Sequence, residues 1–107
     1  MQRGEIRWAS RNRHGERQPV LVVQEDEFNA SLIPTVLCAV ISDKTRLAHA
    51  PGNVYLSTEA SGLSKDGVVN IAQLVTVHRK FLSEPVGRVG GRLLREVDEG
   101  LRLVLAI

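Results

Sequence analysis

The sequence predicts a mainly β protein with one helix at its C-terminus. Most apolar segments either alternate with polar residues or run for about five residues between turn signals, which is typical of strands. In the last segment, apolar residues recur at intervals of three and four, which is typical of a helix. The 107 residues are 43% hydrophobic and 24% charged, so we expect one globular domain over residues 1–107.

The first strand is expected at residues 4–9. Ile6 and Trp8 fall on one face of this segment, and Glu5 and Arg7 fall on the other, which is the period of a half-buried strand. We therefore expect Trp8 to pack in the core or in a dimer interface rather than to stack on a nucleic-acid base.

Two apolar strands follow, one on each side of an acidic segment. Pro19 opens the first of them, at residues 19–24, and the second spans residues 35–42. Both are apolar on both faces, so we expect them at the centre of the sheet, with Cys38 as a core residue and not a nucleophile. Between them, residues 25–31 form either a turn or one short helix.

The second half of the chain is predicted to complete an antiparallel sheet of about six strands. A turn signal at residues 50–53 precedes a strand at 53–57. Residues 68–71 and 74–77 form either one further strand or a bent pair, and residues 86–89 add a short strand.

The C-terminal segment is predicted to be an amphipathic helix. Leu94, Val97, Leu101 and Val104 are spaced three, four and three residues apart, so they form its buried stripe. Aromatic residues make up only 4% of the chain, so the core that this helix covers consists mainly of Val, Leu and Ile.

Composition excludes several classes of protein. The longest apolar run, residues 36–41, is far shorter than the roughly 20 residues of a membrane-spanning helix, and residues 1–5 lack the apolar stretch of a signal peptide. A single cysteine cannot form an internal disulfide, and three scattered histidines do not make a metal site, so we expect no metal and no cofactor. These features predict a reducing, cytoplasmic location.

Positive charge is concentrated near the N-terminus. The net charge is +2, but residues 1–18 carry five arginines and two glutamates, whereas residues 19–42 carry three acidic residues and no Lys or Arg. Much of this positive charge falls in a polar loop expected at residues 10–18. Arginine suits bidentate contacts with phosphate, although a solvated basic loop has the same composition.

A cation and a hydroxyl are expected at one rim of the sheet. Arg17 precedes the second strand and Ser42 ends the third, so antiparallel pairing of these strands brings the two residues together. Such a pair suits phosphoryl transfer on RNA, because the Arg neutralises the developing phosphorane and the hydroxyl donates a hydrogen bond to it. The 2′-hydroxyl of the RNA then serves as the nucleophile. The glycine-rich residues 86–91 lack the Lys-Ser/Thr of a phosphate-binding loop.

Five motifs follow one another along the chain. They are RGEIRW at residues 3–8, PVLVVQ at 19–24, PTV at 34–36, DGVVNIAQ at 66–73 and VGRV at 86–89. Their order and spacing resemble those of the MazF/PemK family of toxin endoribonucleases over essentially the whole chain. The opening motif, the strand that begins at Pro19 and the DGVVNIAQ segment are specific as a set.

The resemblance implies an SH3-like β-barrel with a C-terminal helix that works as a homodimer. It implies a metal-independent endoribonuclease that cuts single-stranded RNA at short sequence motifs and leaves a 2′,3′-cyclic phosphate and a 5′-hydroxyl. It also implies inhibition by a MazE-like antitoxin, whose disordered tail occupies the RNA groove.

The resemblance also assigns the main site residues. The hydroxyl that ends the third strand in the family falls on Ser42, and the substrate-contacting glutamine of the later strand falls on Gln73. The catalytic Arg of the family stands immediately before the proline of the second strand, where this chain has Gln18, with Arg17 one residue earlier. Because successive side chains of a strand point to opposite faces, this one-residue offset decides the direction in which the Arg17 side chain points. Arg13 is the reserve candidate.

Further polar residues are candidates for contacts with the substrate. His14 can donate a proton to the leaving oxygen, because histidine titrates at about pH 6.5. Together with Gln18, Gln73 and Arg13 it is assigned to substrate binding. Gln73 and Asn70 either contact the substrate or satisfy backbone groups at a strand end.

Two other functions stay open at the level of the sequence. A CcdB-like toxin with the same barrel poisons gyrase, but that activity depends on aromatic and apolar residues at the end of the helix, and residues 103–107 contain no Trp. A non-catalytic RNA-binding barrel is the second alternative. Cleavage of RNA in EDTA separates the ribonuclease from both.

Overall fold

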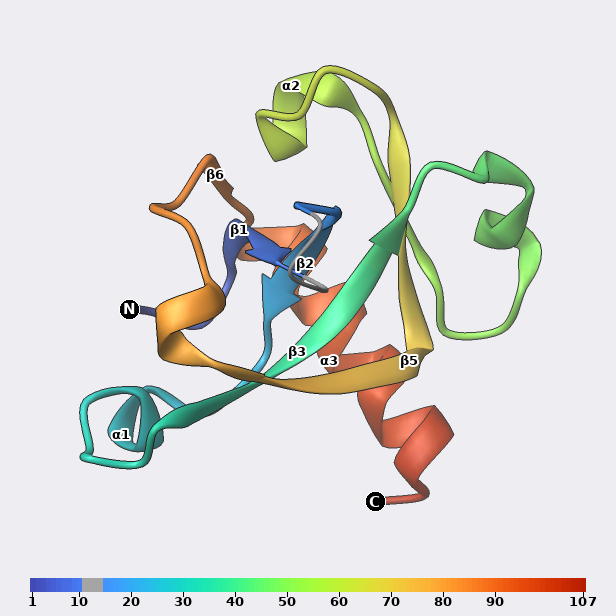
Figure 1. Cartoon of the computed structure of the whole chain (residues 1–107). Helices are drawn as coiled ribbons and strands as arrows, with labels where there is room; N and C mark the ends of the chain where they lie inside the picture. The colour runs from blue at the N-terminus through green and yellow to red at the C-terminus, as the bar shows by residue number, and fades with distance from the viewer. Residues whose placement is uncertain (11–14) are drawn as a thin grey trace.

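The computed structural model describes residues 1–10 and 15–107. This part of the chain forms a curled, six-stranded antiparallel sheet, half of a barrel, with one long helix packed against it (Figure 1). The strands are β1 (Glu5–Ser10), β2 (Arg17–Val22), β3 (Thr35–Ser42), β4 (Val54–Leu56), β5 (Gly67–His78) and β6 (Gly87–Arg88). The helices are α1 (Asp26–Asn29), η1 (Thr45–His49), α2 (Thr58–Ser61), η2 (Arg79–Phe81) and α3 (Gly91–Leu105).

The strands follow the order β4-β5-β3-β2-β1-β6 across the sheet. The predicted mainly β class with a C-terminal helix is thereby confirmed, and β2 and β3 lie at its centre as expected. The segment that the sequence left as a turn or a short helix is α1. Within β3, Leu37 is 37% exposed, so the expectation of burial on both faces is wrong at that position.

β2 begins at Arg17, two residues earlier than predicted. Trp8 lies opposite Pro19 in the β1–β2 pair, while β3 pairs with β2 only from Val20 onward. The missing N–H of Pro19 therefore removes no bond from the β2–β3 ladder, and the proline fits inside the strand. Arg17 and Gln18 thus belong to a strand rather than to a loop, and their side chains point to opposite faces.

β5 is one long bent strand. Both of its halves pair with β3, but Ala39 lies opposite Leu74 whereas Val40 lies opposite Asn70. Residues 71–73 are therefore inserted on the β5 side, and an insertion of this kind bends a strand and increases its twist. The bent strand is visible in Figure 1, where β5 descends past the end of β3 and then curves across the lower part of β3.

The main core lies between the sheet and α3. Its buried side chains are aliphatic: Ile6, Leu21, Val23, Ala39, Ile41, Val54, Leu56, Val69, Ile71, Val89 and Val97. Residues that alternate with these along β2 and β3 form a smaller buried cluster on the opposite face of the sheet, and Cys38 belongs to it as predicted. The expected Val, Leu and Ile core is therefore confirmed.

The predicted stripe of α3 packs against the core at three of its four positions. Val97 is buried, and Leu94 and Leu101 pack against the main core, but Val104 is 45% exposed. The expectation for Val104 is wrong because the last turn of α3 projects past β5 (Figure 1). None of the helices in the described residues is long and apolar enough to cross a membrane.

Candidate functional site

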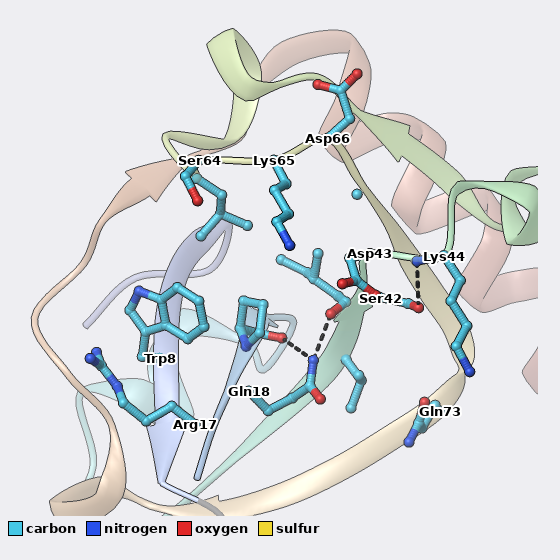
Figure 2. A pocket seen from close by; sticks show the side chains of 15 residues that line it. Trp8, Arg17, Gln18, Ser42, Asp43, Lys44, Ser64, Lys65, Asp66 and Gln73 are labelled. Atoms are coloured by element: carbon cyan, nitrogen blue, oxygen red, sulfur yellow. Dashed lines mark hydrogen bonds between the residues drawn. The ribbon is translucent and has the colours of Figure 1, made fainter. Parts of the chain in front are cut away.

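An open pocket of about 530 Å³ lies at the rim of the sheet where β2 begins and β3 ends. Trp8 of β1 bounds one side of it, and Ser42 of β3 bounds the other (Figure 2). The remaining lining comes from the start of β2, the end of β3 and the segment after it, the α2–β5 connection, and the start and bulge of β5. Segments that are far apart in the sequence thus meet at this rim because β1, β2, β3 and β5 are neighbours in the sheet.

The structure brings four of the six predicted site residues together. These are Arg17, Gln18, Ser42 and Gln73, which all line the pocket. Arg13 and His14 lie outside the described residues, so their roles stay predictions.

Ser42 is the last residue of β3 and is half-buried at the pocket wall. Its Oγ accepts a hydrogen bond from the backbone N–H of Lys44 at 3.1 Å. This hydroxyl donates to none of the residues that the structure describes, so its hydrogen is available to an acceptor in the pocket. A serine hydroxyl oriented in this way can donate to a phosphoryl oxygen.

Gln18, and not Arg17, shares a face of the sheet with Ser42. Continuing the register of the β2–β3 pair toward the start of β2 places Gln18 opposite Ser42. The Gln18 amide donates to the carbonyl oxygen of Ile41 at 2.6 Å (Figure 2). The side chain therefore ties the start of β2 to the end of β3 and brings no charge to the pocket.

The one-residue slip turns Arg17 toward Trp8. Arg17 is two residues from Pro19, which lies opposite Trp8, so Arg17 and Trp8 are diagonal neighbours on one face. The guanidinium carbon of Arg17 lies 5.0 Å from the centre of the Trp8 ring, which makes a cation–π contact. Figure 2 shows this pair on the side of the pocket away from Ser42.

Trp8 belongs to neither buried cluster, so of its two expected places the core is wrong, while a dimer interface stays a prediction. It faces the same side of the sheet as Ile6, as the alternation predicted, but it lies two residues closer to the rim. There it is half-buried and exposes part of its ring to the pocket.

Gln73 reaches the pocket because it belongs to the bulge of β5. Its Oε1 accepts a hydrogen bond from Asn70 Nδ2 at 3.3 Å. The sequence left open whether Gln73 and Asn70 satisfy backbone groups at a strand end. Among the described residues, the two side chains bond each other and neither bonds a backbone group. The N–H groups of Gln73 can therefore donate to a ligand.

Four charged residues that sequence reasoning did not single out also line the pocket. Asp43 and Lys44 directly follow Ser42, and Lys65 and Asp66 directly precede β5. Neither pair falls within a strand or helix that the sequence predicted. The signal that places them here is the pairing of the start of β5 with Ser42, which the sequence alone does not show.

Asp66 is held away from the centre of the pocket. Its carboxylate accepts a hydrogen bond from the Tyr55 hydroxyl and another from the backbone N–H of Thr58, the latter at 3.0 Å. The bond to Asp66 raises the pKa of Tyr55 above its usual value. Figure 2 shows the Asp66 carboxylate pointing out of the pocket and the Lys65 side chain pointing into it.

The lining as a whole favours an anionic ligand. It holds three cations, Arg17, Lys44 and Lys65, and two carboxylates, of which that of Asp66 is already bonded elsewhere. Cations, a hydroxyl and amides together can bind the oxygens of a phosphodiester. Within residues 1–10 and 15–107, no three His, Cys, Asp or Glu side chains are grouped to hold a metal ion.

The sequence matches a known family over nearly its whole length. The family model described as PemK-like, MazF-like toxin of type II toxin-antitoxin system matches residues 2–105. Endoribonuclease MazF6 of Mycobacterium tuberculosis is 45% identical over 108 residues, which cover 96% of this chain and 95% of that protein. Endoribonuclease EndoA of Bacillus subtilis is 29% identical over 87% of this chain and 79% of that protein.

Solved structures share the fold. An endoribonuclease in complex with its cognate antitoxin, from a mycobacterial species, has a TM-score of 0.84 and 19% identity over 100% of this chain and 96% of that one. A MazE-MazF crystal structure from Deinococcus radiodurans has a TM-score of 0.78 and 17% identity over 100% of this chain and 96% of that one. The predicted MazF/PemK-like fold is thereby confirmed.

Proposed function

This chain belongs to the PemK-like, MazF-like toxin family of type II toxin-antitoxin systems, and on that basis we propose that it is an endoribonuclease acting on single-stranded RNA in the pocket between Trp8 and Ser42. The observation that carries the proposal is the pocket lining, in which an available hydroxyl shares a rim with three cationic side chains. A phosphodiester needs such donors, because negative charge accumulates on its oxygens during cleavage. The curated relatives named above are endoribonucleases.

The proposed reaction uses a nucleophile that belongs to the substrate. The 2′-oxygen of one ribose forms a bond to the adjacent phosphorus, while the bond from phosphorus to O5′ breaks and leaves its electron pair on O5′. Water takes the proton of the 2′-hydroxyl and supplies a proton to O5′. The products are a 2′,3′-cyclic phosphate and a 5′-hydroxyl, and the protein cations rather than a metal ion stabilise the charge on phosphorus.

We assign one role to each predicted residue that lines the pocket. Ser42 donates its available hydrogen to a phosphoryl oxygen, and Arg17 adds positive charge from the Trp8 side. Gln18 holds the ends of β2 and β3 together through its bond to the carbonyl oxygen of Ile41, and so keeps Ser42 in place for the substrate. Gln73, oriented by its bond from an asparagine of the same strand, donates to a flanking nucleotide.

The proposal extends to the partners of the chain. We expect a homodimer, because exposed apolar side chains at the end of α3 form a surface that a second copy can cover. They are Leu103, Val104, Leu105 and Ile107, with exposed fractions of 62%, 45%, 49% and 81%. We also expect inhibition by a MazE-like antitoxin, in line with the antitoxin complexes among the solved relatives. A single, buried cysteine fits a cytoplasmic location.

The test is incubation of the purified protein with a long single-stranded RNA in EDTA, followed by mapping of the new 5′ ends. We expect cuts at a short sequence motif with 5′-hydroxyl termini, and we expect Ser42→Ala and Arg17→Ala to cut more slowly and to arrest cell growth less. The matched control is Ser31→Ala, which removes an exposed serine of the loop after α1.

Three outcomes would contradict the proposal. The first is an absence of cuts together with growth arrest that Ser42→Ala leaves unchanged. The second is inhibition of gyrase by the same preparation, which would favour a CcdB-like toxin. The third is tight binding of RNA without cleavage, which would favour a non-catalytic RNA-binding barrel.

A further inference from the structure

The residue directly opposite Ser42 carries no charge. Gln18 occupies that place, and its amide is engaged with the carbonyl oxygen of Ile41. Arg17, the cation of β2, lies over Trp8 on the other side of the pocket (Figure 2). A phosphate that accepts a hydrogen bond from Ser42 therefore needs a cation from another element.

Lys65 is the cation whose side chain extends into the middle of the pocket. In Figure 2 it reaches from the α2–β5 connection into the space between the Trp8 side and the Ser42 side. Its ammonium group forms no ion pair or hydrogen bond with the residues that the structure describes. Lys44 also lines the pocket, but its side chain is directed toward Gln73 at the outer edge (Figure 2).

The backbone that carries Lys65 is held in place on its C-terminal side. The carboxylate of Asp66 is anchored by the Tyr55 hydroxyl and by a backbone N–H of α2. A Cβ at Gly67 would lie 3.0 Å from the carbonyl oxygen of Ser42, so this backbone passes directly against the end of β3. The backbone on the C-terminal side of Lys65 is therefore fixed against the end of β3, and an ammonium presented by a fixed backbone loses less freedom when it binds an anion.

We propose that Lys65 is a catalytic residue, whose ammonium contacts the phosphate that is cleaved, on the side opposite the Ser42 hydroxyl. This inference rests on the proposed ribonuclease function and adds a residue to it. As the 2′-oxygen bonds to phosphorus and the bond to O5′ breaks, two phosphoryl oxygens gain negative charge. Lys65 donates to one of them and Ser42 to the other, and Lys65 keeps all three of its protons throughout.

The test compares lysine substitutions in the full-length protein on one RNA oligonucleotide that the wild type cuts. Lys65→Met is expected to lower kcat about 100-fold, the effect of removing one donor to a developing oxyanion, with KM changed less than about threefold. Lys65→Arg is expected to restore kcat to within about tenfold of wild type, because it returns the charge. The matched control is Lys80→Met, in η2 outside the pocket, which is expected to cut at the wild-type rate.

The outcomes distinguish a failure of the Lys65 role alone from a failure of the ribonuclease function on which it rests. If the wild type cuts RNA and Lys65→Met cuts equally well, Lys65 is not catalytic while the ribonuclease proposal stands. A larger loss of kcat in Lys44→Met than in Lys65→Met would also overturn the inference. The inference would also be overturned if Lys65→Met lowers both kcat and the melting temperature and Lys65→Arg does not restore kcat. If the wild type cuts no RNA, both the function and the inference are wrong.

Discussion

Replacing Ser42 with alanine separates catalysis from stability. The Ser42 Oγ accepts one hydrogen bond, from the backbone N–H of Lys44 at 3.1 Å in an exposed setting, and its hydrogen is available to the substrate. In Ser42→Ala the Lys44 N–H is left to water, so the free energy of unfolding falls by less than about 1 kcal/mol. The transition state loses one donor to a developing oxyanion, which is worth roughly 3 kcal/mol or about 100-fold in kcat.

Two measurements check this prediction on the same preparations. Cleavage of an RNA oligonucleotide gives kcat and KM, and thermal unfolding gives a melting temperature that is expected to fall by less than about 5 °C. Ser31→Ala is the matched control, because it removes an exposed serine hydroxyl that donates to the carbonyl oxygen of Phe28, accepts from the backbone N–H of Ile33 and does not line the pocket. It is expected to keep the wild-type kcat.

The reasoning about Ser42 fails if Ser42→Ala retains more than about a third of the wild-type kcat, since the hydroxyl would then not face the charge that develops. It also fails if the melting temperature of Ser42→Ala falls by more than about 10 °C, because the loss of activity would then come from a destabilised fold.

Three further predictions concern the fold that presents the pocket. Gly100→Ala places a Cβ against a carbonyl oxygen of the turn before β4, so overpacking of about 1–3 kcal/mol exceeds the helix gain of about 1 kcal/mol and the melting temperature falls. Gly90→Ala, with nothing within 4 Å of the added Cβ, should lower the melting temperature less, because it costs only the poorer capping of α3 by alanine at the N-cap position. Burial raises the pKa of Cys38 to about 12, so iodoacetamide should label it only after unfolding, and rapid labelling of the native protein would contradict its burial. Burial acts to raise the pKa of Glu5, but hydrogen bonds from a backbone N–H and from Arg7 lower it below its usual 4.5. The ionised Glu5 therefore stabilises the fold above about pH 4.5, and this contribution is lost as the pH falls below that value. Glu5→Gln should flatten this part of the plot of unfolding free energy against pH.

Strand positions were largely predictable because each depends on local alternation. Ile6 packs in the core and Glu5 does not, as the period of two requires, and the apolar runs of β2 and β3 lie at the centre of the sheet. The start of β2 was not predictable in this way. Pro19 suggested a beginning, but β3 pairs with β2 only from Val20, so the strand tolerates the proline and extends back to Arg17.

The bulge of β5 has no local signature in the sequence. Three residues, 71–73, are inserted opposite the junction of Ala39 and Val40, and this depends on how two distant segments pair. The family resemblance assigns Gln73 to the substrate, and Gln73 lines the pocket because of this insertion, which the alternation pattern does not show.

The Ser42 hydroxyl at the pocket was predictable from the sequence, whereas the orientation of Arg17 and the presence of Lys44 and Lys65 were not. Ser42 could be placed because it ends an apolar strand. Arg17 lines the pocket, but its side chain faces Trp8. It stands one residue before the position of the family arginine, and side chains of successive strand residues point in opposite directions. Lys65 could not be found, because its place beside Ser42 depends on the pairing of β3 with β5 and on the anchoring of the neighbouring Asp66.

The central claim is that the substrate supplies the nucleophile in this pocket. The most direct measurement uses two RNA oligonucleotides that contain one mapped cleavage site and differ only in a 2′-hydroxyl or a 2′-hydrogen on the nucleotide before the cleaved bond. We predict cleavage of the first, with a 2′,3′-cyclic phosphate detected by mass spectrometry, and binding without cleavage of the second. Cleavage of both oligonucleotides at the same rate would contradict the claim.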